Sequence, residues 1–190
     1  MIYHNVAEIF GGINDTRQRL AGRVTGLGSS LENFRPAADA WTIAEIVEHL
    51  SIIEGQLIRM VNLLLKQAEA SGARAQGDDV NDNKSPLVDL RAIIERAAKE
   101  KYQAPETVRP QGNSTVVESL AKLQTTRASL VALRPRLEAA DLSQVKYPHP
   151  VFGPLDLYQW LAFIGIHEDR HLRQIERLIA SPEFAAAATA

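Results

Sequence analysis

The chain has 190 residues, of which 45% are hydrophobic and 23% charged, which suits one globular domain with a full core. Its formal net charge of -2 gives no electrostatic basis for binding nucleic acid or an anionic membrane. Because cysteine is absent, the sequence excludes disulfides, cysteine-ligated zinc, iron–sulfur clusters and a cysteine nucleophile.

No apolar run approaches the roughly 18–20 residues that would span a bilayer. The opening sequence MIYHNVAEIF lacks the layout of a signal peptide, so we expect a cytoplasmic location. We expect a single domain over residues 1–181 and a disordered tail over residues 182–190, which end in FAAAATA.

Two helices are predicted in the first part of the chain. The first begins at Asn5, and Glu8 follows at the spacing of a capping box. The second has the strongest start signal of the chain, because Thr42 and Glu45 also have this spacing and apolar residues recur after them at helical intervals. Its apolar stripe consists of Ile43, Ile46, Val47, Leu50, Ile53, Leu57, Val61 and Leu64.

The middle of the chain predicts a long crossover, a short helix and a third long helix. Residues 71–84 are polar and aperiodic, and the segment is long enough to cross a bundle. Ser85 is expected to cap the short helix. Thr115 and Glu118 predict the start of the third long helix, which Pro135 should kink or end.

Residues 141–155 contain three prolines and predict an irregular connection to the last helix. That helix should begin at Asp156, with Gln159 as its capping partner, and stop before Pro182. The periodicity shows no convincing strand or hairpin. The sequence therefore predicts an all-α fold with four long helices.

Three of the five histidines occupy positions that apolar residues would normally take. His167 and His171 are four residues apart, which places both rings on one face of the last helix. His49 lies at the edge of the apolar stripe of the second helix. Imidazoles on an apolar face need partners for their nitrogens, and three of them with open positions left for water or substrate describe a catalytic metal site.

Other side chains are open to more than one interpretation. Glu168 falls within the stripe of the last helix, where it would orient a ligand, carry a proton or form an ion pair with an arginine across the bundle. Glu45 is a second catalytic candidate, although its place in the capping box is the simpler role. His149 lies in a loop that could reach the site. Glu48 and Asp169 are expected to face solvent.

Two segments carry a resemblance to a known family. These are WTIAEIVEHL at 41–50 and HPVFGPLDLYQWLAFIGIHEDRHLRQI at 149–175. They resemble the DinB/YfiT-like helical metalloproteins, which show a Trp before a helix, a His eight residues on, and a late H-x-x-x-H followed by Q-I. The matching residues here are Trp41, His49, His167, His171, Gln174 and Ile175.

The resemblance implies an up-up-down-down-like four-helix bundle, often dimeric, with one Zn, Ni or similar divalent ion on His49, His167 and His171. Characterised relatives resemble thiol S-transferases that use bacillithiol, mycothiol or glutathione. We therefore expect a transferase that activates a low-molecular-weight thiol for attack on an electrophile. A hydrolase that uses metal-bound water and a non-catalytic, stress-related metal- or ligand-binding protein are the alternatives. The expected partners are a small-molecule substrate and a second copy of the chain.

Overall fold

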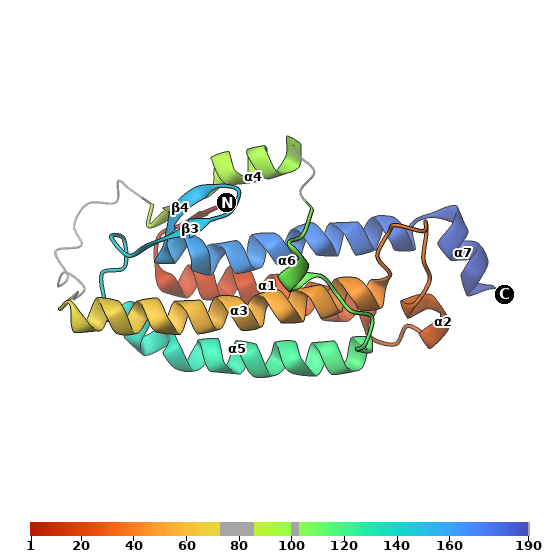
Figure 1. Cartoon of the computed structure of the whole chain (residues 1–190), viewed down its shortest axis with the longest axis horizontal. Coiled ribbons are helices and arrows are strands. Elements are labelled where there is room, and N and C mark those ends of the chain that lie inside the picture. The colour runs from red at the N-terminus through yellow and green to blue at the C-terminus, as the bar shows by residue number, and fades with distance from the viewer. Residues whose placement is uncertain (73–85, 100–102, 190) are drawn as a thin grey trace.

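The computed structural model describes residues 1–72, 86–99 and 103–189, and four long helices dominate it (Figure 1). These are α1 (Val6–Val24), α3 (Ile43–Ala70), α5 (Val116–Glu138) and α6 (Leu157–Ile179). Helices α1 and α6 run in one direction and α3 and α5 in the other, as Figure 1 shows. The predicted four-helix bundle is confirmed. Its up-down-down-up order is a variant of the arrangement expected, with the long crossover joining the parallel helices α3 and α5.

The predicted helix starts are confirmed by their capping hydrogen bonds. The side chain of Asn5 accepts the N–H of Glu8 at the start of α1. The other three long helices each begin with a complete capping box, in which the cap side chain and the side chain three residues on satisfy each other's backbone N–H. The pairs are Thr42 with Glu45, Thr115 with Glu118, and Asp156 with Gln159.

The sequence predicted that Pro135 would kink or end the third long helix. Helix α5 does not end there but continues to Glu138. Proline removes the hydrogen bond to the carbonyl of Val131. Val131 is exposed, so water can satisfy that carbonyl.

The prediction for the short helix after the crossover was wrong in its start. Helix α4 covers Arg91–Lys99, while strand β2 (Val88–Asp89) pairs antiparallel with strand β1 (Ile2–Tyr3). Val88 and Leu90 are buried, so this segment contributes to the core as a strand and its end. Ser85, the expected cap, lies outside the described residues.

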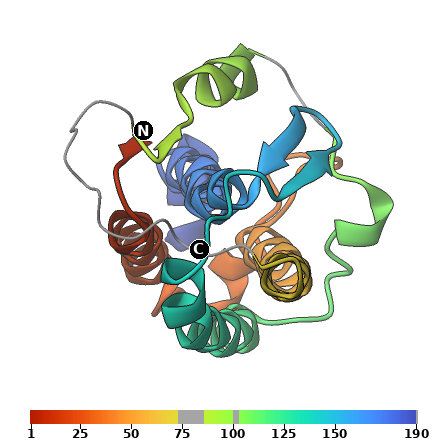
Figure 2. The same cartoon turned by 90° about the vertical axis from the view of Figure 1, so that its left-hand side faces the viewer.

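The connection before α6 contains a hairpin that the sequence analysis did not predict. Strands β3 (Lys146–His149) and β4 (Gly153–Asp156) pair antiparallel, with Pro148 opposite Pro154. Gly153 has a φ of 79°, which glycine adopts without strain. Seen end-on, the hairpin and α4 lie beside α6 (Figure 2).

The expected disordered tail is also corrected, because residues Pro182–Ala188 form helix α7. Ser181 caps this helix by accepting the N–H of Phe184. The ring of Phe184 is buried and meets Phe34 edge-on, with ring centroids 5.6 Å apart. Phe34 follows the short helix α2 (Ser29–Glu32), so α7 and the segment between α2 and α3 contribute to one apolar contact.

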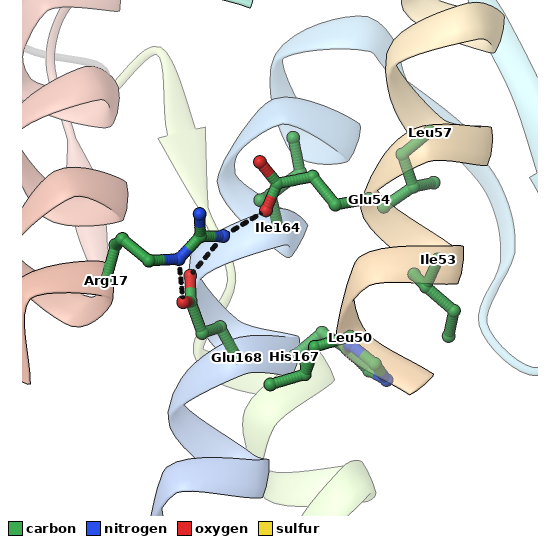
Figure 3. Close-up of a pocket in the computed structure, with 8 residues that line it drawn as sticks. All are labelled: Arg17, Leu50, Ile53, Glu54, Leu57, Ile164, His167 and Glu168. Atoms are coloured by element: carbon green, nitrogen blue, oxygen red, sulfur yellow. Dashed lines mark hydrogen bonds and ion pairs between the residues drawn. The ribbon is translucent and has the colours of Figure 1, made fainter. Parts of the chain in front are cut away.

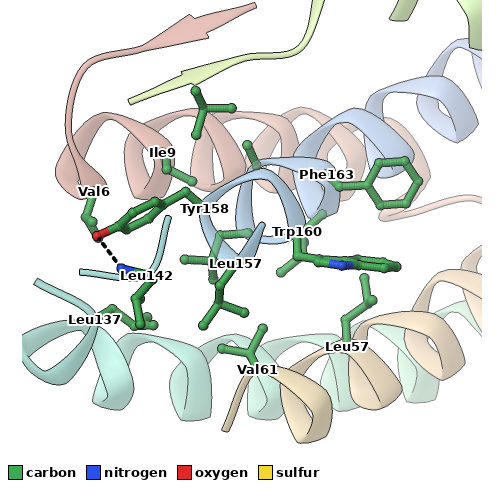
Figure 4. Packing of buried hydrophobic residues seen from close by; sticks show 14 of the residues in the cluster. Val6, Ile9, Leu57, Val61, Leu137, Leu142, Leu157, Tyr158, Trp160 and Phe163 are labelled. Carbon is green, nitrogen blue, oxygen red and sulfur yellow. Dashed lines mark hydrogen bonds between the residues drawn. The ribbon is translucent and has the colours of Figure 1, made fainter. Parts of the chain in front are cut away.

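The apolar core is divided into two clusters along the bundle. One cluster lies around Ile13, Val61 and Leu161, and Figure 4 shows part of it. The other lies around Val47 and Leu172. On each long helix, one charged residue lies near the boundary between the stretches that belong to the two clusters. We call these four residues the charged layer: Arg17, Glu54, Arg127 and Glu168.

No helix among the described residues is both long enough and apolar enough to cross a membrane.

Candidate metal centre

The antiparallel packing of α3 against α6 brings His49, His167 and His171 together. One ring nitrogen of each residue lies within 4.8 Å of the corresponding nitrogens of the other two. The ring centroids are 4.7 to 5.3 Å apart. Zn–N bonds are about 2.0–2.1 Å long, so three nitrogens this close can share one ion after small adjustments.

Hydrogen bonds fix the orientation of two of the rings. Nδ1 of His49 lies 2.7 Å from the carbonyl oxygen of Val108, which can only accept, so Nδ1 carries the proton. Val108 belongs to the short 3-10 helix η1 (Glu106–Val108) in the crossover. Nδ1 of His171 lies 2.9 Å from Oε1 of Gln174 and donates to it. Both rings therefore have a lone pair on Nε2, as metal ligands require.

The environment keeps the three imidazoles neutral. Burial lowers the pKa of His49, although the bond to Val108 opposes this shift. Burial and the neighbouring His171 and His49 rings hold the pKa of His167 well below its usual value. Burial, reinforced by His49, lowers the pKa of His171 to about 3. Because histidine binds metal in its neutral form, the site is prepared for an ion at neutral pH.

Aromatic side chains cover the site on two sides. The ring of Trp41 lies 4.8 Å from that of His49 and stacks at 6.3 Å on that of His171. The ring of Phe163 lies 5.9 Å from that of His167. Such rings exclude water from the ligands and limit their rotation.

Comparison with known proteins finds a matching family. The sequence profile described as the DinB superfamily matches residues 13–175, which include all three histidines. The chain belongs to the DinB superfamily. It is similar to the uncharacterized protein YuaE of Bacillus subtilis (strain 168), with 27% identity over 166 residues that cover 87% of this chain and 93% of YuaE.

This DinB-superfamily chain also shares its fold with a solved structure, described as TT2238, a four-helix bundle protein. The TM-score is 0.57 with 20% sequence identity, and the match covers 90% of this chain and 98% of the other. At this level of identity the likeness concerns the fold alone.

In this DinB-superfamily chain, Glu168 lies in the charged layer, so the ion-pair interpretation is the one that the structure supports. It faces Arg17 of α1, which also binds Glu54 of α3 (Figure 3). Arg127 of α5 reaches both carboxylates, at 3.2 Å from Glu54 and 3.4 Å from Glu168. Burial raises the pKa of Glu168, and Arg17 and Arg127 oppose that shift.

Glu45 is occupied at the start of α3. One of its oxygens accepts the N–H of Thr42, and the other binds Arg35 at 2.6 Å. Burial alone would raise the pKa of Glu45, but the hydrogen bonds from Arg35 and Thr42 bring it below the usual value. The structure therefore gives Glu45 a capping role, and its polar partners among the described residues are Thr42 and Arg35, not the three histidines.

Two expectations about solvent-facing carboxylates are corrected. Glu48 is buried, because the crossover passes over it and the N–H of Gly112 donates to its Oε2 at 2.9 Å. Asp169 is only 15% exposed and is bound by Arg19 and Arg173.

The structure places His149 at the end of β3, against the aromatic residues of the hairpin and α6. Its ring lies 4.7 Å from Phe163, and Nδ1 accepts the N–H of Val151 at 3.1 Å. Burial lowers the pKa of His149 to about 4. His149 thus shares Phe163 with His167 but is not one of the three converging ligands.

Four residues near the site were missed in the sequence. Arg17, Glu54 and Arg127 each sit where an apolar stripe should continue, for example between Leu50 and Leu57 in the case of Glu54. This is the signal that identified Glu168, so it could have found them too. Val108 acts through its backbone carbonyl, which no residue pattern reveals.

Proposed function

We propose that this protein is a metal-dependent transferase that binds one divalent ion, Zn or Ni, through His49, His167 and His171 and activates a low-molecular-weight thiol. The observation that carries the proposal is the set of three neutral imidazoles converging from two helices. Three ligands leave coordination positions for exogenous molecules, which is typical of catalytic and not structural metal sites.

The donor set fits such an ion. When bound, the ion would lower the pKa of a coordinated thiol so that the sulfur is a thiolate at neutral pH. The chain supplies no cysteine, so the thiol must belong to a second molecule.

The contacts of the protein side chains favour thiol transfer over hydrolysis. A hydrolase benefits from a general base within hydrogen-bond reach of the attacking water. The two carboxylates considered for that role, Glu45 and Glu168, are held by Arg35 and Arg17 in other contacts. A thiol that loses its proton on coordination needs no such base. The chain's own task is then to hold the ion, orient the rings and exclude water with Trp41 and Phe163.

The test is a panel of low-molecular-weight thiols assayed with the electrophile monochlorobimane. We expect turnover with at least one thiol, loss on chelation, and recovery on adding Zn or Ni. His167→Ala should abolish turnover. His4→Ala, which changes an exposed histidine outside the site, is the matched control and should retain it.

Other outcomes would support other functions. Ester or amide cleavage in the absence of thiol would support the hydrolase. Metal binding without turnover of either kind would support a binding protein.

A further inference from the structure

The three candidate ligands differ in how their second ring nitrogen is satisfied. His49 donates to Val108 and His171 to Gln174. Within the described part of the chain, His167 makes no hydrogen bond to a protein group. A histidine that binds metal nearly always donates its other N–H to a carboxylate, a carbonyl or a water molecule. A partner for His167 is therefore expected nearby.

A small cavity next to His167 supplies a place for that partner. It is bounded by His167, by Arg17, Glu54 and Glu168 of the charged layer, and by apolar side chains of α3 and α6 (Figure 3). Its interior has room for about one water molecule. A buried water needs two to four polar partners, and the charged layer provides them on one wall.

The acceptors on that wall are held firmly. Each carboxylate is bound by both arginines, and Arg127 also donates to the carbonyl of Ile13 at 2.7 Å. Arg17 donates to the carbonyl of Leu123 at 3.0 Å. The two arginines are thus anchored to backbone, and they fix Glu54 and Glu168 in position at the edge of the cavity.

We propose that a water molecule in this cavity accepts the free N–H of His167 and donates to the carboxylates of Glu54 and Glu168, so that the charged layer orients His167 for metal binding. This inference rests on the metal site proposed above. It makes Glu168 and Glu54 positioning residues that act through His167. The alternative is that the charged layer serves only the packing of the helices, and the test distinguishes the two.

The experiment uses the full chain loaded with Co²⁺. Proton NMR in H₂O and D₂O counts the exchangeable imidazole N–H signals shifted by the ion, and competition with a chromophoric chelator gives the affinity. We expect three exchangeable signals in the wild type, one for each histidine ligand. In Glu168→Gln the His167 signal should disappear through exchange, and affinity should fall about tenfold.

A second variant avoids any change in the ion pairs. Ile53→Phe enlarges a half-buried side chain that lines the cavity, so it should exclude the water and cause the same two losses. Ile166→Phe is the matched control, because Ile166 is also half-buried but does not line the cavity. Glu69→Gln, which breaks the exposed pair with Arg136, controls for charge.

The outcomes separate the two proposals. Three signals and unchanged affinity in both Glu168→Gln and Ile53→Phe would overturn this inference and leave the metal site intact. Only two exchangeable signals in the wild type would also overturn it, because His167 would then face bulk water. A wild type that takes up no Co²⁺ would overturn the metal site itself, and this inference with it.

Discussion

The neutral state of the buried imidazoles links the metal site to acid stability. An unfolded histidine has a pKa near 6.5, whereas burial lowers that of folded His171 to about 3. Below pH 6.5 the unfolded chain therefore binds protons that the folded chain does not. A group with a lowered pKa contributes stability that is present above pH 6.5 and is lost as the pH falls toward 3.

We accordingly predict that the metal-free protein, prepared with a chelator, loses stability on mild acidification. At pH 5, His171 alone should reduce the free energy of unfolding by about 2 kcal/mol relative to pH 7.5. Urea denaturation at the two pH values measures the change. His171→Gln should show a smaller pH dependence than the wild type. An equal dependence in both proteins would mean that His171 is not held neutral.

Each of the two histidines on α6 should be necessary for metal binding. We predict about one divalent ion per chain in the wild type and loss of most of it in His167→Ala and in His171→Ala, because two imidazoles bind far more weakly than three. Elemental analysis after dialysis measures the content. His149→Ala should keep its ion, since His149 lies outside the triad. Full retention in both α6 variants would exclude the site.

The residue-scale prediction from sequence depended on finding polar side chains inside apolar stripes. That reasoning predicted that His49, His167 and His171 would converge, as the structure shows. It could not foresee the crossover that covers Glu48, because Gly112 is 64 residues away in sequence and no local pattern links them.

At the scale of the elements, α1 and α6 lie close together at Gly165. A Cβ atom there would lie 3.1 Å from Cγ2 of Ile13, a fully buried side chain that cannot easily move. We predict that Gly165→Ala destabilises the protein by about 1 kcal/mol despite its better helix propensity.

Gly55 provides the matched control for this prediction. It lies within α3, and an added Cβ there would make only ordinary contacts, the nearest at 3.7 Å. Gly55→Ala should stabilise the protein by about 0.5–1 kcal/mol through helix propensity. If chemical denaturation gives the two substitutions the same sign, the close approach of α1 and α6 is not limiting.

Helix α7 should stabilise the protein through Phe184. We predict that Phe184→Ala lowers the free energy of unfolding by about 3 kcal/mol, because it empties a buried position next to Phe34. The comparison is Val117→Ala at a 73% exposed position, which should change stability by less than about 0.5 kcal/mol. A negligible effect of Phe184→Ala in urea denaturation would show that α7 is detached in solution.

Elements were predictable where their signals are local. A capping box involves only a cap residue and the residue three positions on, so it can be read from the local sequence. The predicted starts of α3, α5 and α6 were therefore correct. The β3–β4 hairpin was missed because prolines argue against strands, yet Pro148 and Pro154 face each other in a short two-stranded ribbon. The alanine-rich tail was predicted to be disordered because its composition gave no sign that Phe184 would be buried against the bundle.

At the scale of the whole molecule, the sequence predicted the class of fold but not the pairing of distant segments. Four amphipathic helices with a long crossover indicate a bundle, and the bundle is confirmed. The pairing of Ile2–Tyr3 with Val88–Asp89 joins segments more than eighty residues apart through backbone hydrogen bonds, and two-residue strands have no periodicity to detect.

The charged layer has a consequence for how the helices align. Each long helix carries one of its four residues, so sliding any helix by one turn, about 5.4 Å, would carry a charge into an apolar cluster. Buried ion pairs often add little net stability, but they can select one alignment among several of similar energy. The charged layer would then select the axial register of the four helices in the bundle.

This consequence can be measured by making the layer apolar with Arg17→Met, Glu54→Leu, Arg127→Met and Glu168→Leu together. We predict that the variant stays helical and at least as resistant to urea as the wild type, yet shows several amide NMR signals per residue from coexisting alignments. The three histidines converge only in the native alignment of α3 and α6. Molecules with another alignment should therefore lose the metal site. A single set of signals would mean that apolar packing alone selects the alignment.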